Sequence, residues 1–228
     1  MIRKTLATLL LLSIAVGAQA VPADSLDEGF DVGAPLTGWA AINNSSPGGT
    51  TGWFQGNPGV FGAQSGTPDS YAGANFENAG FGGNISNWLL TPELNLVEGS
   101  TLSFYTRSNG AFPDRLEVRL STSGASLDVG ATDASVGAFT TLWLTLNPAL
   151  NLGGYASDWT QYSFSIFGVG GLTGRFAFRY YVTDTSVNGD YIGIDSVVYR
   201  IPEPGTLALF LLASASLALS LRRRTRIK

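Results

Sequence analysis

The chain has 228 residues, a formal net charge of −4, and neither cysteine nor histidine. That length suits one domain of moderate size. The missing residue types exclude disulfides, thiolate nucleophiles, Ser–His triads, histidine acid–base catalysis and cysteine- or histidine-bound zinc, so much of ordinary enzyme chemistry is ruled out.

Residues 1–20 have the composition of a secretory signal peptide. A charged start and an apolar stretch ending at Val16 precede Ala18 and Ala20, which fit the small–x–small cleavage pattern. We therefore expect cleavage after Ala20 and an exported mature chain that begins at Val21.

The segment 21–201 is acidic and free of lysine. It holds six arginines and sixteen aspartates and glutamates, a net charge of −10. Nucleic acid is excluded as a natural partner because its phosphates need Lys and Arg for neutralisation. Calcium suits such a segment better, since hard cations prefer carboxylate oxygens.

Hydrophobic residues alternate through the middle of the chain, which is typical of strands with one buried face. Leu116, Val118 and Leu120 should point inward together, as should Ile192, Ile194 and Val198 on the last strand. The strands expected from this pattern and from the turn residues between them are 26–31, 87–90, 101–106, 115–120, 140–145, 160–166, 175–180 and 191–199. No helical period is sustained, so 21–201 is predicted to be one all-β domain, a jelly-roll-like β-sandwich.

The stretch 43–86 is rich in glycine, asparagine and aromatic residues and contains neither Lys nor Arg. Its rings either fold inward to pin a long loop onto the sandwich or cover the apolar faces of sugar rings. On the second interpretation Trp53, Phe54 and Tyr71 are candidate glycan contacts.

Four arginines fall on the polar faces of two predicted strands. Arg115 and Arg119 flank Glu117 on one strand, and Arg175 and Arg179 share a face of another. If the strands are neighbours, Arg115 and Arg119 belong to a basic stripe suited to acidic sugars. The alternative is cross-strand pairing of these arginines with Glu117 and other acids.

Two pairs of carboxylates could in principle hydrolyse glycosides without histidine. Asp114 lies near Glu117 in the sequence, and Asp184 lies near Asp190. Nothing distinguishes either pair from ordinary turn and edge residues. The sequence therefore predicts no catalytic residues.

The last segment, 202–228, has three parts. Pro202, Glu203 and Pro204 form a stiff extended peptide, 207–221 is apolar and uncharged, and 222–228 is basic. As a helix the apolar part rises about 22 Å, enough for a thin bilayer, and the arginines place its end in the cytoplasm.

This tail resembles the PEP-CTERM sorting signal of Gram-negative bacteria. The resemblance implies recognition by an exosortase, a membrane protease-transpeptidase that cuts near Pro202-Glu203-Pro204. The protein would cross the inner membrane, stay anchored through 207–221 for a time, and then reach the cell surface or the exopolysaccharide matrix.

The middle resembles the choice-of-anchor J domain, which is related to cleaved-adhesin jelly rolls. The resemblance extends from about Leu26 to Tyr199, and it implies an extracellular adhesion or matrix protein without implying an enzyme. The matching pieces are Glu28-Gly29-Phe30-Asp31, Gly38-Trp39, Gly52-Trp53-Phe54, 87–92, 102–107, 114–121, Trp159-Thr160, 174–180 and 191–197.

Related jelly rolls often hold a structural calcium ion, and the resemblance puts its ligands at Glu28, Asp31 and Asp195. An aspartate inside an apolar strand is also unfavourable without a cation or hydrogen-bond donors. The alternative is an Asp195 that faces solvent or pairs with an arginine.

Taken together, the sequence predicts an exported, non-catalytic protein that acts by adhesion or glycan binding, with exopolysaccharide as a natural ligand. Two alternatives stay open, namely a glycan-active enzyme on the same sandwich and a structural matrix component without a ligand.

Overall fold

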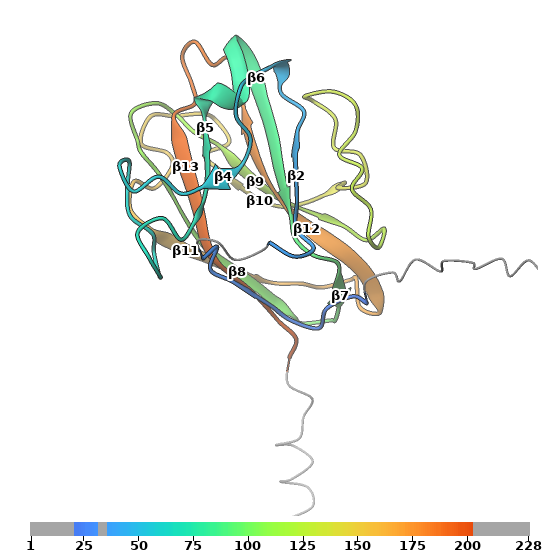
Figure 1. Ribbon diagram of the computed structural model, residues 1–228. Helices are drawn as coiled ribbons and strands as arrows, with labels where there is room; N and C mark the ends of the chain where they lie inside the picture. The colour runs from blue at the N-terminus through green and yellow to red at the C-terminus, as the bar shows by residue number, and fades with distance from the viewer. Residues whose placement is uncertain (1–20, 32–35, 203–228) are drawn as a thin grey trace, which may run out of the picture.

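The computed structural model describes residues 21–31 and 36–202, which form two β-sheets packed face to face (Figure 1). The predicted signal peptide, with Ala18 and Ala20, and the tail from Glu203 and Pro204 onward lie outside these residues. The strands are β1 (Leu26–Glu28), β2 (Ala40–Asn43), β3 (Ser46–Gly48), β4 (Phe54–Gln55), β5 (Ala72–Asn75), β6 (Ala79–Leu90), β7 (Leu94–Leu96), β8 (Thr101–Ser108), β9 (Leu116–Ser121), β10 (Thr141–Leu146), β11 (Thr160–Ser165), β12 (Leu172–Val182) and β13 (Tyr191–Arg200).

All the strands pair antiparallel, and the chain crosses repeatedly between the sheets. One sheet has the order β11-β8-β13-β5-β4 with β1 beside β13, and the other has β10-β9-β12-β6-β2 with β3 beside β6 and β7 beside β12. The helical structure within the described residues is one 3-10 turn, η1 (Phe76–Asn78). This arrangement confirms the predicted all-β sandwich.

No helix in 21–31 or 36–202 has the length and apolar character needed to cross a membrane.

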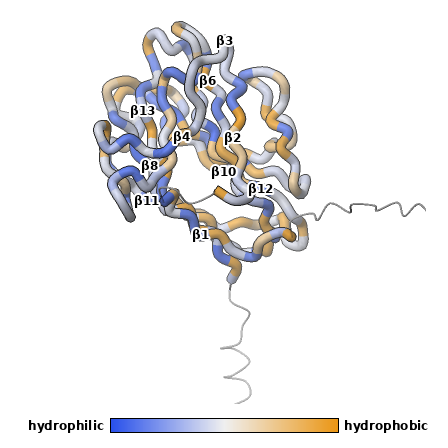
Figure 2. The backbone as a smooth tube through the Cα atoms, viewed as in Figure 1, coloured by the Kyte–Doolittle hydropathy of each residue, from blue (hydrophilic) through white to orange (hydrophobic). Residues whose placement is uncertain are grey.

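The inward faces follow the predicted alternation. Leu116, Val118 and Leu120 of β9 are fully buried, and Phe178 of β12 meets Phe104 of β8 across the sandwich with ring centroids 4.9 Å apart. Figure 2 shows the hydrophobic stretches gathered along the central strands, where the two sheets face each other. Burial of this apolar surface is the main favourable contribution to folding.

The last strand departs from the predicted alternation at one point. Its pairing with β8 shifts between Asp195 and Val198, and Ser196 has a φ of 50°. This β-bulge inserts an extra residue and reverses the faces that follow it. Val197 is therefore fully buried, and the expectation that Val198 points inward with Ile194 is wrong because Val198 is only half-buried.

Strand β13 runs from one end of the sandwich to the other. Arg200 closes β13, and β1 pairs beside it with Leu26 opposite Tyr199, so both ends of the described chain lie low in Figure 1. A Cβ added to Gly99 would lie 3.4 Å from Pro202. We call this the terminal end, and we call the opposite end, where β13 begins, the far end.

A second apolar cluster covers the outer face of the β9-β12-β6 sheet. Val129 and Phe139 of the loop 122–140 pack on Trp88 of β6, with the Trp88 and Phe139 rings 5.8 Å apart. The outer face of this sheet is therefore covered by a loop instead of by solvent.

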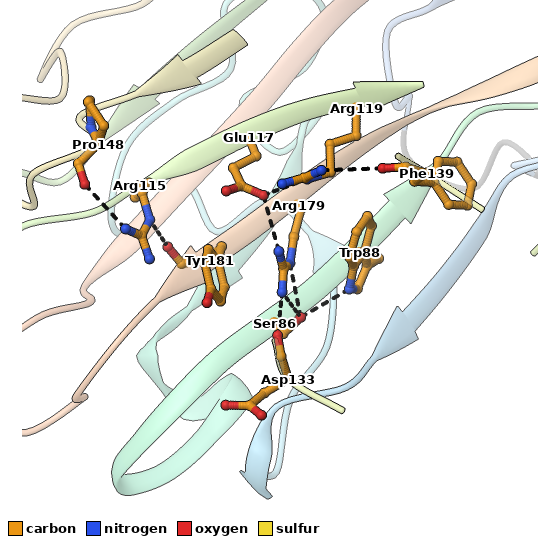
Figure 3. Close-up of polar contacts among 10 residues, drawn as sticks. All are labelled: Ser86, Trp88, Arg115, Glu117, Arg119, Asp133, Phe139, Pro148, Arg179 and Tyr181. Atoms are coloured by element: carbon orange, nitrogen blue, oxygen red, sulfur yellow. Dashed lines mark hydrogen bonds and ion pairs between the residues drawn. The ribbon is translucent and has the colours of Figure 1, made fainter. Parts of the chain in front are cut away.

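Beneath this loop lies a buried ion-pair network (Figure 3). Glu117 accepts from Arg119 at 2.7 Å and from Arg179 at 3.2 Å, and Arg179 is 1% exposed. The Arg179 guanidinium also donates to Ser86 Oγ and to the Asp133 carbonyl and lies over the Trp88 ring. Glu117 is thus the anion that two arginines on adjacent strands share.

Glu117→Gln keeps the size of the side chain and removes its charge, which leaves the buried Arg179 without an anion. Loss of one partner of a buried pair costs about 3–5 kcal/mol, and we expect a fall of that order in the free energy of unfolding, measured with urea. Asp27→Asn breaks the exposed Asp27–Arg200 pair and should cost less than about 1 kcal/mol. Equal losses in the two variants would contradict this assignment.

Candidate functional site

Two hollows at the far end of the sandwich share one wall, the side chain of Phe76 in η1. Phe76 is 49% exposed, and Phe81 near the start of β6 is 90% exposed. We call the first the glycine hollow, of about 280 Å³, which is also walled by Gly48, Gly49, Thr50, Glu77, Phe81 and Thr185. We call the second the asparagine hollow, of about 240 Å³, which is also walled by Phe54, Asn57, Asn75, Asn109, Asp190 and Tyr191.

The glycine hollow has a backbone wall because glycines allow two segments to approach closely. A Cβ on Gly49 would lie 1.9 Å from the Glu77 carbonyl oxygen, and one on Gly83 would lie 2.7 Å from Pro47. Phe81 and Gly82 lie near the start of β6, and Gly82 has a φ of 72°, a conformation that favours glycine. The Phe81 ring is exposed to solvent at this point of the strand.

The asparagine hollow collects amide and carboxylate groups from four segments of the chain. Asn109 Nδ2 donates to Asp190 Oδ2 at 3.0 Å, and the Ala111 amide donates to the same oxygen at 3.2 Å. Asn75 accepts from Thr51 at 2.7 Å through its side-chain oxygen. The polar groups are therefore held in place by contacts with one another before any ligand binds.

A buried carboxyl group supports this hollow from below. Asp114 Oδ1 accepts the backbone N–H of Asp190 at 2.8 Å and the Tyr180 hydroxyl at 2.5 Å. Asp114 is fully buried, and its other oxygen has no hydrogen-bond partner among the described residues. Burial raises the pKa of Asp114 to about 7, although both hydrogen bonds act in the opposite direction.

The chemistry of the two hollows suits hydroxyl-rich ligands. Exposed aromatic rings cover apolar faces, and amides and carboxylates exchange hydrogen bonds with hydroxyl groups. The two charged side chains on their walls, Glu77 and Asp190, are acids, and neither Lys nor Arg is among the lining residues. An anionic ligand would therefore meet repulsion here.

The predicted aromatic contacts divide between the two interpretations. Tyr71 is fully buried, and its hydroxyl is 3.1 Å from that of Tyr191, so its ring is closed to a sugar. Trp53 is partly buried in a third hollow, of about 190 Å³, beside Phe30. Phe54 lines both that hollow and the asparagine hollow, which leaves it as the predicted ring nearest to the candidate site.

The predicted arginine stripe is replaced by pairing. Strands β9 and β12 are neighbours, as the stripe requires. Arg115, however, donates to the carbonyls of Tyr181 and Pro148, and Arg119 donates to Glu117 and to the Phe139 carbonyl. The structure therefore favours the alternative of pairing with Glu117 for Arg119 and Arg179, whereas backbone carbonyls hold Arg115.

Each of the three predicted calcium ligands has contacts of its own within the protein. Asp195 is fully buried and accepts the backbone N–H groups of Gln64, Ser65 and Ser196, while the Ser196 hydroxyl donates to Gln64 Oε1 at 2.8 Å. Asp195 therefore does not face solvent, and its closest hydrogen-bond partners among the described residues are backbone amides and not an arginine.

Glu28 accepts the Phe30 amide at 2.8 Å, and Asp31 lies beside Gly66. The described part of the chain holds no cluster of three acidic side chains suited to a metal ion. Calcium binding stays a prediction from the resemblance.

The predicted carboxylate pairs do not form an open acid–base site. Asp114 is fully buried, and Glu117 is 7% exposed and paired with arginines. Asp184 bonds to Ser186 in its own turn, while Asp190 belongs to the asparagine hollow. Pro202, the first residue of the predicted sorting motif, is exposed just beyond β13.

Phe76 and Phe81 belong to the aromatic stretch 43–86 for which a sugar-binding surface was predicted, although neither was among the named candidate contacts. Sequence reasoning missed Asn109 and Asp190 as members of this site. The meeting of Asn109 with Asp190 depends on strand pairing between segments about eighty positions apart, which the pattern of one strand does not contain.

No family model matches the chain, and no curated protein matches its sequence. Solved structures do match it. The K1 cleaved adhesin domain of the Lys-gingipain of Porphyromonas gingivalis W83 has a TM-score of 0.55 and 24% identity, covering 78% of this chain and 98% of that domain. The fold resembles that of cleaved adhesin domains.

Two further domains of Lys-gingipain give the same result. The K3 domain has a TM-score of 0.50 and 25% identity, covering 77% of this chain and 97% of that domain. The K2 domain has a TM-score of 0.53 and 18% identity, covering 78% of this chain and 99% of that domain. The predicted adhesin-like β-sandwich is thereby confirmed at the level of the fold.

The raised pKa of Asp114 makes stability depend on pH. A carboxyl with a higher pKa in the folded chain than in the unfolded chain favours folding at low pH, and this contribution is lost as the pH rises through about 7. We expect the free energy of unfolding to fall by about 2–4 kcal/mol between pH 5 and pH 8.

Asp114→Asn should remove most of this slope in urea titrations at the two pH values. Asp195, whose pKa burial also raises, contributes in the same direction and leaves a remainder. Asp184→Asn is the matched control, because the Ser186 hydrogen bonds lower the pKa of Asp184 and place its titration below this range. A slope unchanged by Asp114→Asn would contradict the assignment.

Proposed function

We propose that this protein is an exported, non-catalytic surface or matrix protein that binds glycans through the two hollows at its far end. The observation that carries the proposal is the pair of exposed rings, Phe76 and Phe81, beside ordered amide and carboxylate groups. Contiguous exposed apolar surface on a protein marks sites of interaction, and these two rings line one hollow together. The cleaved-adhesin fold supports a role in adhesion.

The ligand class we propose is a neutral polysaccharide. Glu77 and Asp190 supply negative charge at the hollows without a basic side chain among the lining residues. Uronic or phosphorylated sugars would need forked contacts from arginine, and Arg115 and Arg119 are engaged elsewhere. This choice replaces the acidic sugars that the arginine stripe suggested.

Export and sorting complete the proposal. Cleavage after Ala20 would release a chain whose first described residue, Val21, is exposed. Pro202 lies two residues after the end of β13 and is also exposed, so the Pro202-Glu203-Pro204 peptide begins where a protease has access to it. An exosortase would then free the domain from its membrane tail into the exopolysaccharide matrix.

Phe76→Ala and Phe81→Ala should each weaken binding to a neutral exopolysaccharide fraction by roughly tenfold, because each removes an apolar surface that a sugar ring covers. Isothermal titration at physiological salt, with calcium and with chelator, measures the effect. Phe167→Ala is the matched control, since Phe167 is 61% exposed at the terminal end.

The wild-type protein and Phe167→Ala should bind equally in both conditions. Binding that survives Phe76→Ala and Phe81→Ala but fails in Arg115→Ala/Arg119→Ala would move the site to the arginine face. Saturable self-association without sugar binding would favour the structural component, and turnover of the polysaccharide would favour the enzyme.

Sorting predicts a specific end to the mature chain. Mass spectrometry of the protein recovered from the matrix of its host should find it without residues 207–221. Recovery of the matrix protein with 207–221 still attached would contradict cleavage by an exosortase.

A further inference from the structure

We propose that the loop 166–171 at the terminal end is a membrane-contacting loop, which enters the bilayer interface while the precursor is anchored. Phe167 in this loop is 61% exposed, and Leu172, directly after it, is 46% exposed. This inference rests on the proposed function in one respect, namely that 207–221 lies in the membrane before sorting.

The loop lies beside the point where the chain leaves the sandwich. Ser165, the last residue of β11, pairs with Thr101, and Thr101 also pairs with Arg200 at the end of β13. The Gly99 amide donates to the Ile166 carbonyl at 2.9 Å. Because Gly99 also lies against Pro202, the loop and the start of the tail are neighbours in space.

The tail is too short to let this end move far from the bilayer. Four residues, 203–206, separate Pro202 from Leu207, where the apolar segment begins. At no more than about 3.5 Å per residue, the five steps from Pro202 to Leu207 span at most about 18 Å in any conformation. The terminal end therefore faces the membrane in the anchored precursor.

The composition of the loop suits a lipid interface. Residues 166–172 carry no charge, and Gly168 and Gly171, with φ of 77° and 82°, allow the tight turn that follows the exposed Phe167. Aromatic and leucine side chains favour the boundary between headgroups and acyl chains. Tethering raises the effective concentration of the loop at the bilayer to the millimolar range, so two side chains are sufficient for contact.

The charged groups at this end are largely engaged within the protein. Both carboxylate oxygens of Glu98 accept the Gly168 amide, at 3.2 and 2.9 Å. Arg200 pairs with Asp27 at 2.6 Å. These contacts leave no unpaired arginine beside the apolar loop in the described part of the chain. Its attraction to lipid therefore comes from the side chains of Phe167 and Leu172 and not from positive charge.

The absence of cysteine from the chain allows a direct test on the full-length protein. Phe167→Cys, Phe81→Cys and Ser214→Cys each provide one site for an environment-sensitive fluorophore. The proteins are reconstituted in vesicles of phosphatidylethanolamine and phosphatidylglycerol that contain a nitroxide-labelled lipid. Phe81 is the matched control, as an exposed phenylalanine at the far end, and Ser214 reports on the tail itself.

We expect the label at 214, inside the bilayer, and the label at 167, at its interface, each to lose at least about half of its emission to the nitroxide lipid, and the label at 81 to be unaffected. If 214 is quenched and 167 is not, the loop inference fails while anchorage stands. Quenching at both 167 and 81 would also overturn it, because the domain would then lie on its side. If 214 is not quenched, the proposed membrane anchorage fails, and the loop inference fails with it.

Discussion

Strand β13 is the constraint on which the rest of the structure depends. It begins at Tyr191, a wall of the asparagine hollow, and ends at Arg200, two residues before Pro202. Ten residues of extended chain span about 30 Å, so one strand fixes the separation between the candidate binding site and Pro202, where the proposed membrane tail begins. In the proposed anchored precursor, this strand would keep a ligand at the far end away from the bilayer.

Buried acids hold this arrangement together through the backbone. Asp195 accepts amides from the loop that holds Gln64 and Ser65, and Asp114 accepts the amide of Asp190 at the hollow. Residue types that suggest metal ligands or catalysts in the sequence thus act here as acceptors for loops that lack their own ladder of hydrogen bonds. Glu117 has a comparable role for the arginines of the outer face.

The sequence was sufficient to predict the fold class and the inward faces of the strong strands. Leu116 and Val118 alternate with charged residues. When one face of a strand must be buried, this alternation assigns the apolar side chains to the core and the charged ones to the outer face. The bulge at Ser196 was beyond prediction, because it depends on pairing with β8 and on hydrogen bonds from a loop about 130 positions away.

The candidate site, too, could be predicted from the sequence only in part. Its aromatic and asparagine content was evident in the stretch 43–86, and the sugar-binding interpretation followed from it. Which rings face solvent depends on the packing of Tyr71, Phe61 and Tyr191 against one another, with centroids of Phe61 5.1 and 5.2 Å from the other two. Composition alone does not distinguish an aromatic ring that packs inward and anchors a loop from one that is exposed for a ligand.

The measurement that tests the central claim most directly is hydrogen–deuterium exchange of the protein with and without the exopolysaccharide of its host. The account predicts slower exchange in the segments 76–83 and 109–111, which surround the two hollows, with no change at 166–172. Protection confined to strands β9 and β12, or to the terminal end, would contradict it.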